Sequence, residues 1–124
     1  MLRMLLVEDN LIFREALRQS ISDRFPPLTI DQAGSSEEAL QKITLNPPHF
    51  VFTDIRLPGM SGLELTQKIK KDFPNIRIAI ITGYDLPEYR QAAARYGAEG
   101  FFGKESLQWD QVEAFIRSIP DKGT

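Results

Sequence analysis

The chain has 124 residues, of which 42% are hydrophobic and 26% charged, as expected for one globular domain with its own core. A formal net charge of −2 does not indicate a nucleic-acid surface, and the absence of cysteine excludes disulfides, thiol chemistry and cysteine zinc sites. No apolar run approaches the ~18 residues of a membrane span, and MLRMLLV at the N-terminus is too short for a signal peptide. These features suit a cytoplasmic protein.

Short apolar strands alternate with helical patterns from the N-terminus onward. MLLV at 4–7 predicts a strand, and the apolar spacing behind it predicts a helix over 11–22. LTID at 28–31 predicts a second, weaker strand. Ser35 and Glu38 then form a capping box, which predicts the start of a helix that a pair of prolines ends.

The same alternation continues through the middle of the chain. FVFT at 50–53 has the unbroken apolar pattern of a strand buried on both faces. A helix is predicted over 62–72, and IRIAIIT at 76–82 predicts the next strand. Pro87 occupies a position that a first helical turn tolerates, so we expect a helix from there to Gly97. EGFF at 99–102 predicts a short fifth strand.

The last apolar face belongs to a helix that ends near Ile119 and carries Val112, Phe115 and Ile116. We expect one domain over residues 1–119, with 120–124 as a short tail or the start of a linker. Five strand–helix units in this length predict an α/β domain with a parallel, doubly wound sheet, because parallel crossovers cover both faces of their strands.

Polar side chains follow the predicted strands at their carboxyl ends. Glu8 and Asp9 follow the first strand, Asp54 follows the third, Thr82 ends the fourth and Lys104 lies just after the fifth. Ligands of such sheets bind beyond the carboxyl ends of the strands. We therefore expect three acids, one hydroxyl and one ammonium group at one edge of the sheet.

This set of side chains suits phosphoryl chemistry. Crowded carboxylates keep their charge only beside a cation, and a chain with no cysteine and only His49 points to oxygen ligands and Mg²⁺. Thr82 can donate to a phosphoryl oxygen, and Lys104 can offer it a positive charge. A carboxylate can itself act as the nucleophile. The site is predicted to accept a phosphoryl group on Asp54 and later to lose it to water.

Four segments carry a resemblance to a known family: MLLVEDN, FVFTDIRLPGMSGLEL, AIIT and GFFGKES. Together they resemble the receiver domain of bacterial response regulators, the phosphoaccepting half of two-component signalling, over essentially the whole chain. Many receivers have proline after the lysine, whereas Glu105 follows Lys104 here, and KES resembles the receivers of NarL/LuxR-type transcriptional regulators. The resemblance implies a flavodoxin-like (βα)5 fold with strand order 2-1-3-4-5.

The resemblance also implies roles at the acidic edge. Asp54 would be the phosphoacceptor, and Glu8, Asp9, Asp54 and the backbone carbonyl of Arg56 would hold Mg²⁺. Thr82 would move to bind the phosphoryl group, and Lys104 would pair with it.

Two further roles follow from the same resemblance. Phe101, three residues before the lysine, would be the switch aromatic whose rotation reshapes the surface of the fourth helix, fifth strand and fifth helix. Arg56 and Tyr84, each two residues after a site residue, would gate the access of water to the phosphorylated aspartate. Both side chains are bulky, which favours slow dephosphorylation.

The implied partners are a sensor histidine kinase and, in a longer protein, a C-terminal helix-turn-helix DNA-binding domain that controls transcription. A homodimer through the switch surface is expected, without direct nucleic-acid or membrane binding by the receiver. Such a domain catalyses its own phosphorylation and dephosphorylation but is mainly a switch. The alternative is an interaction module that is never phosphorylated. A haloacid-dehalogenase-type phosphatase is disfavoured, because it needs a second aspartate where Arg56 stands.

Each residue also has a purely structural interpretation. Glu8 and Asp9 could cap the first helix, Asp54 could start a turn, Thr82 could end a strand and Lys104 could be a solvated loop charge. The joint occurrence at the ends of several strands favours the functional interpretation. His49 is expected in an exposed loop, and Trp109 as a packing residue on the last helix.

Overall fold

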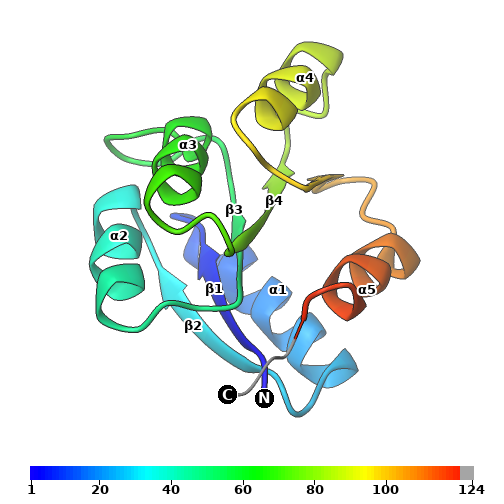
Figure 1. Cartoon of the computed structure of the whole chain (residues 1–124). Helices are drawn as coiled ribbons and strands as arrows, with labels where there is room; N and C mark the ends of the chain where they lie inside the picture. Colours follow the sequence, from blue (N-terminus) through cyan, green and yellow to red (C-terminus); the bar gives the residue numbers. More distant parts are fainter. Residues whose placement is uncertain (121–124) are drawn as a thin grey trace.

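The computed structural model describes residues 1–120, so residues 121–124 of the expected tail lie outside the described part. A parallel sheet of five strands forms the centre of the molecule, in the order β2-β1-β3-β4-β5 (Figure 1). The expected α/β class and strand order are confirmed. The strands are β1 (Arg3–Val7), β2 (Thr29–Ala33), β3 (Phe50–Thr53), β4 (Arg77–Thr82) and β5 (Gly100–Gly103).

One helix follows each strand, and none of them within residues 1–120 is long and apolar enough to cross a membrane. Asn10, Ser35 and Ser61 begin the first three helices, each accepting a hydrogen bond from the backbone N–H three residues later. The helices are α1 (Leu11–Arg24), α2 (Ser36–Leu45), α3 (Gly62–Asp72), α4 (Pro87–Arg95) and α5 (Trp109–Arg117).

The helices cover both faces of the sheet, which explains the unbroken apolar pattern of β3. Phe50 and Phe52 pack with α1 and α5 on one face, whereas Val51 packs with α2 and α3 on the other. Helix α4 packs through Ala93 against Ile80 of β4. Because successive residues of a strand point to opposite faces, every residue of a central strand must suit a buried environment.

Two expectations about single residues had different outcomes. Trp109 packs against the core at the start of α5, with the Arg24 guanidinium 4.1 Å from its ring centre, so its packing role is confirmed. His49 lies in the loop before β3 as expected, but the expectation that it is exposed was wrong. His49 is half-buried, and its Nδ1 accepts a hydrogen bond of 3.0 Å from the backbone N–H of Arg3 at the start of β1.

Candidate functional site

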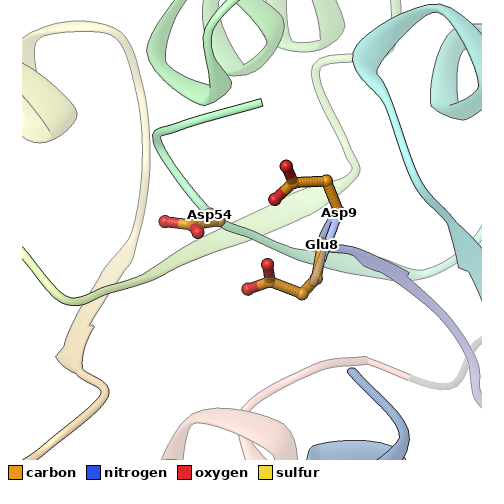
Figure 2. Close-up of side chains that lie close together, drawn as sticks. All are labelled: Glu8, Asp9 and Asp54. Carbon is orange, nitrogen blue, oxygen red and sulfur yellow. The ribbon is translucent and has the colours of Figure 1, made fainter. Parts of the chain in front are cut away.

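The register of the sheet brings the acids together. Val7 of β1 pairs with Thr53 of β3, and the Asp54 N–H then donates to the Val7 carbonyl at 3.1 Å. The two strands therefore end side by side, and Glu8, Asp9 and Asp54 follow them. Each acid offers a carboxylate oxygen within 4.8 Å of the others (Figure 2).

The donor set of this acidic cluster fits a hard cation. All three ligand groups are carboxylates, which suit Mg²⁺ far better than a soft metal. Glu8 and Asp54 are only 2% and 7% exposed, whereas Asp9 is exposed. Two buried charges are held on one side of the cluster, and the third faces solvent, from which a hydrated ion can enter.

Lys104 provides the positive charge inside the cluster. Its Nζ lies 2.6 Å from Glu8 Oε1 and 3.0 Å from Asp54 Oδ2, with the lysine side chain 20% exposed. Its backbone N–H donates to the Thr82 carbonyl at 2.8 Å, which continues the pairing of β4 with β5. Burial opposes the charged form of Lys104, but the hydrogen bonds and the negative charges of Glu8 and Asp54 together outweigh it and raise the pKa of Lys104. Lys104 is therefore not a solvated loop charge.

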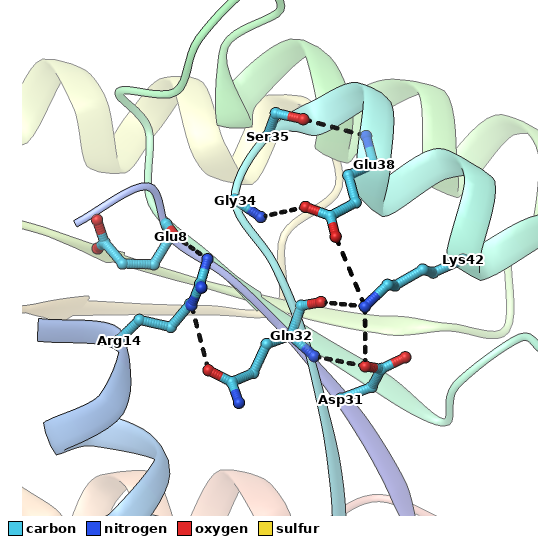
Figure 3. Close-up of polar contacts among 8 residues, drawn as sticks. All are labelled: Glu8, Arg14, Asp31, Gln32, Gly34, Ser35, Glu38 and Lys42. Carbon is cyan, nitrogen blue, oxygen red and sulfur yellow. Dashed lines mark hydrogen bonds and ion pairs between the residues drawn. The ribbon is translucent and has the colours of Figure 1, made fainter. Parts of the chain in front are cut away.

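Glu8 is held on several sides. Its Oε2 accepts a hydrogen bond of 2.9 Å from the Asn10 N–H, and the Arg14 guanidinium donates to its backbone carbonyl at 3.0 Å (Figure 3). Burial raises the pKa of the Glu8 carboxyl, and the charge of Asp54 adds to this, against the lowering effect of the bonds from Lys104 and Asn10. The Glu8 side chain is thus held in place, and its carboxyl is a weaker acid than that of an exposed glutamate.

Sequence reasoning missed the positioning roles of Asn10 and Arg14. Asn10 caps α1, with Oδ1 accepting from the Phe13 N–H at 3.0 Å, so the alternative that Glu8 or Asp9 serves as the cap is wrong. An asparagine directly before a helical pattern was an available signal for that cap. Arg14 also donates to the Gln32 side chain on β2 at 3.1 Å, which joins α1 to the edge strand. No pattern in the sequence indicated that contact.

Two glycines shape the chain after Asp54, and one of them lies close to the Asp54 backbone. A side chain at Gly62 would place its Cβ 1.8 Å from the Asp54 carbonyl oxygen, so only glycine fits where α3 begins. Gly59 has a φ of 73°, in the left-handed region that favours glycine. Asp54 Oδ1 accepts from the Ile55 N–H at 2.7 Å, but its Oδ2 accepts from Lys104, 50 residues away. Asp54 therefore does more than start a local turn.

Thr82 ends β4 close to Lys104. It is fully buried, and its Oγ1 accepts a hydrogen bond of 3.0 Å from the Tyr84 N–H. Thr82 and Lys104 line one hollow of ≈ 570 Å³ between the loops that follow β4 and β5. Thr82 and Lys104 therefore lie at the same hollow, although the Thr82 hydroxyl is buried and must turn before it can meet a ligand there.

The two residues expected to act as a gate contact each other. Arg56 and Tyr84 are both exposed, and the guanidinium carbon of Arg56 lies 4.4 Å from the centre of the Tyr84 ring. Arg56 also lines a hollow of ≈ 450 Å³ together with Asp9. The structure therefore places Arg56 beside the acidic cluster and joins it to the loop after β4.

Phe101 lies on β5, away from the carboxylates. Its ring is half-buried against a small core group that includes Ile80 and Ala93. The Arg90 guanidinium of α4 lies 4.6 Å from the ring centre, and it pairs with Asp85 at 3.0 Å. Phe101 thus connects the sheet to α4.

The parallel sheet and the acidic cluster at its carboxyl edge define an α/β domain of the receiver type. Comparison with known families gives the same class. The chain belongs to the response regulator receiver domain family, whose model matches residues 4–116. Among curated relatives, the transcriptional activator protein ExaE of Pseudomonas putida is 35% identical over 93% of this chain and 54% of its own length. The oxygen regulatory protein NreC of Staphylococcus carnosus is 29% identical over 95% of this chain and 54% of its own length. The chain spans about half the length of these relatives.

Solved structures show the same fold. A LuxR-family two-component response regulator from Aurantimonas sp. SI85-9A1 superposes with a TM-score of 0.86 and 30% identity over 94% of this chain and 84% of that one. The response regulator TrrA of Thermotoga maritima, solved with Mg²⁺ and BeF, has a TM-score of 0.83 and 31% identity over 94% and 97% of the two chains. The acidic cluster of this chain suits Mg²⁺ as well.

Proposed function

We propose that this domain is a phosphorylation-controlled switch in which Asp54 accepts a phosphoryl group. The observation that carries the proposal is the hydrogen bond between Lys104 Nζ and Asp54 Oδ2, made inside a cluster of three carboxylates. Asp54 is buried, one of its oxygens accepts a hydrogen bond from a lysine, and the neighbouring carboxylates suit Mg²⁺. These are the surroundings of a nucleophile for phosphoryl transfer.

In the proposed reaction, a carboxylate oxygen of Asp54 attacks the phosphorus of the donor. The new bond joins this oxygen to phosphorus, and the bond to the leaving group breaks. Acetyl phosphate releases acetate, and a phosphohistidine releases its imidazole, which takes up a proton from solvent. Glu8, Asp9, Asp54 and the backbone carbonyl of Arg56 would hold the ion. When bound, Mg²⁺ neutralises charge on the oxygens of the transferred group.

Thr82 and Lys104 then bind the transferred group. The Lys104 ammonium moves its hydrogen bond from Asp54 Oδ2 to a phosphoryl oxygen, which keeps a charge-assisted bond on the same side of the site. The Thr82 hydroxyl, whose oxygen accepts a hydrogen bond from the Tyr84 N–H, turns and donates a hydrogen bond to another phosphoryl oxygen. This movement pulls on the loop after β4.

Arg56 and Tyr84 control the loss of the phosphoryl group to water. Water attacks phosphorus, the bond to Asp54 breaks, and inorganic phosphate leaves. The Arg56 guanidinium and the Tyr84 ring are both exposed, and the contact between them supports their proposed role as a gate against water. The switch surface of α4, β5 and α5 would respond through Phe101, which contacts Arg90 of α4 and has no hydroxyl to bond.

The wider role is inferred from the relatives, several of which are named as transcriptional regulators or activators. A sensor histidine kinase would supply the phosphoryl group, and a helix-turn-helix domain following the receiver would bind DNA in the cytoplasm. The receiver would extend over residues 1–119, and it would dimerise through the switch surface. It would bind neither DNA nor a membrane directly.

The experiment combines purified protein with Mg²⁺ and acetyl phosphate and follows the intact mass. We expect the wild type to gain one acid-stable, base-labile phosphoryl group, and Asp54→Asn to gain none. Omission of Mg²⁺ should abolish the gain in the wild type. An unmodified wild type would instead favour the alternative, an interaction module that works without phosphorylation.

A further inference from the structure

A third group lies against the ammonium of Lys104, besides Glu8 and Asp54. The Nζ atom lies over the ring of Phe13, 4.3 Å from its centre. The face of an aromatic ring carries partial negative charge and attracts a cation. Phe13 reads in the sequence as a residue of the apolar face of α1, and nothing in its spacing sets it apart from a core residue.

Phe13 belongs to a closed ring of contacts with Asn10, Glu8 and Lys104. Glu8 Oε2 accepts from the Asn10 N–H, and Asn10 Oδ1 accepts from the Phe13 N–H. The Phe13 ring contacts Lys104 Nζ, and Lys104 Nζ forms an ion pair with Glu8 Oε1 at 2.6 Å, which closes the ring of contacts. The cap of α1 thus holds both the acid and the aromatic ring that contact the same ammonium group.

We propose that Phe13 is a positioning residue for Lys104, with its ring face holding the ammonium beside Asp54, where the phosphoryl group arrives. This inference rests on the proposed phosphoryl transfer. Phe13 touches neither the donor nor the acceptor and acts only through Lys104.

The physical need follows from the shape of lysine. Four flexible carbons carry its charge, so the ammonium must be restrained to meet a new group in one place. Two carboxylates attract it, but Asp54 becomes an acyl phosphate during the reaction, so its carboxylate loses its charge and the negative charge lies on the phosphoryl oxygens instead. The Phe13 ring does not change, and it keeps the ammonium in place while its partner changes. A positioned charge accelerates the transfer because less reorganisation is needed.

The test compares the initial rate of phosphorylation by acetyl phosphate, at saturating Mg²⁺, in three variants. Phe13→Leu keeps an apolar side chain without a ring face, and it should lower the rate by about two- to thirtyfold, the range of one cation–π contact. Phe13→Tyr keeps the face and should restore the wild-type rate. Phe25→Leu is the matched control, because Phe25 is a half-buried aromatic at the other end of α1 that packs against the same core. It should leave the rate unchanged.

A spectroscopic measurement tests the contact without any phosphorylation. The ε-methylene protons of Lys104 should be shifted upfield by the ring current in the wild type and in Phe13→Tyr, and should lose that shift in Phe13→Leu. A wild type that accepts no phosphate would reject the proposed function, whereas this shift would still report on the contact. The positioning role is overturned if the shift is absent in the wild type. It is equally overturned if Phe13→Leu reacts as fast as the wild type, or if Phe13→Tyr and Phe13→Leu are equally slow.

Discussion

The Arg56 guanidinium lies over the Tyr84 ring, 4.4 Å from its centre, and so joins the loop after β3 to the loop after β4. The Tyr84 ring also lies 6.0 Å from the ring of Tyr89 on α4. The Arg56 charge on one loop, the Tyr84 ring on the other and the tilted Tyr89 ring of α4 therefore form one cover. Such a cover should act as a unit.

Removing either half of this cover should speed the loss of phosphate from Asp54. We expect Arg56→Ala and Tyr84→Ala each to accelerate dephosphorylation by about two- to fivefold, the range of an exposed cation–π contact. The double variant should be no faster than the faster single variant, because the two residues share one interaction. The decay of the phosphorylated mass after removal of the donor gives these rates.

Arg117→Ala is the control for this measurement, since Arg117 is an exposed arginine on α5 whose only ion pair, among the described residues, is with Glu113. It should decay like the wild type. Equal decay rates for the wild type and both single variants would reject the gate.

Lys104→Met should destabilise the metal-free protein. The substitution leaves Glu8 and Asp54 buried without their cation, and breaking a buried pair in this way costs on the order of 3 kcal/mol. Added Mg²⁺ should recover part of the loss, because it replaces the missing charge. Urea denaturation with EDTA and with Mg²⁺ measures both effects.

Lys68→Met makes the same change in charge at an exposed position of α3 and serves as the control. Its free energy of unfolding should stay near that of the wild type in both buffers. A Lys104 variant as stable as this control would show that the buried carboxylates do not need the lysine.

Glu8 should titrate above the ordinary range of a glutamate in the metal-free protein, because burial and the charge of Asp54 raise its pKa. Between the unfolded and folded pKa values, the folded state holds more protons, so this group makes the fold less stable as pH rises through that window. A ¹³C NMR titration of the side-chain carboxyl in EDTA gives the value. Asp54→Asn removes one raising charge, so the pKa of Glu8 should fall; a rise would contradict the assigned cause.

Gly62→Ala should destabilise the fold and disturb the site together. The added Cβ would meet the Asp54 carbonyl oxygen at 1.8 Å, and this neighbour is backbone that cannot turn away. Overpacking of this kind costs about 3 kcal/mol. Gly83→Ala is the control, since a Cβ there meets nothing within 4 Å. The midpoint temperature of thermal unfolding and the affinity for Mg²⁺ should both fall in Gly62→Ala. Both should stay near the wild-type values in Gly83→Ala.

Much of the fold could be predicted because local signals agreed with each other. The apolar run at 50–53 lies within a buried strand, and Ser35 caps a helix as its spacing indicated. Two helix ends differ by two residues from the expectation, because α1 runs to Arg24 and not to residue 22, and α5 ends at Arg117 and not near Ile119. Polar residues near a helix end carry no periodic signal, so such ends are hard to locate from the sequence.

The site was predictable where a residue type is unusual for its position, and not elsewhere. An acid such as Asp54 directly after a buried strand is rare enough to draw attention. Phe13 and Arg14 have ordinary roles for their positions, and only contacts with Lys104 and the Glu8 carbonyl give them a further one. His49 was assigned to solvent because of the neighbouring prolines, although its ring nitrogen accepts a bond from the backbone of β1.

Successive side chains of β3 pack against helices on opposite faces of the sheet. This limits where residues can be inserted into the chain. Phe52 faces α1 and α5, and Val51 faces α2 and α3, so one residue inserted into this strand would exchange the two layers and turn Asp54 away from Lys104. Residues inserted at 46–49, before the strand begins, would leave that parity unchanged. Homologous receivers should therefore vary in length in this loop and keep the number of residues between the start of β3 and the aspartate constant.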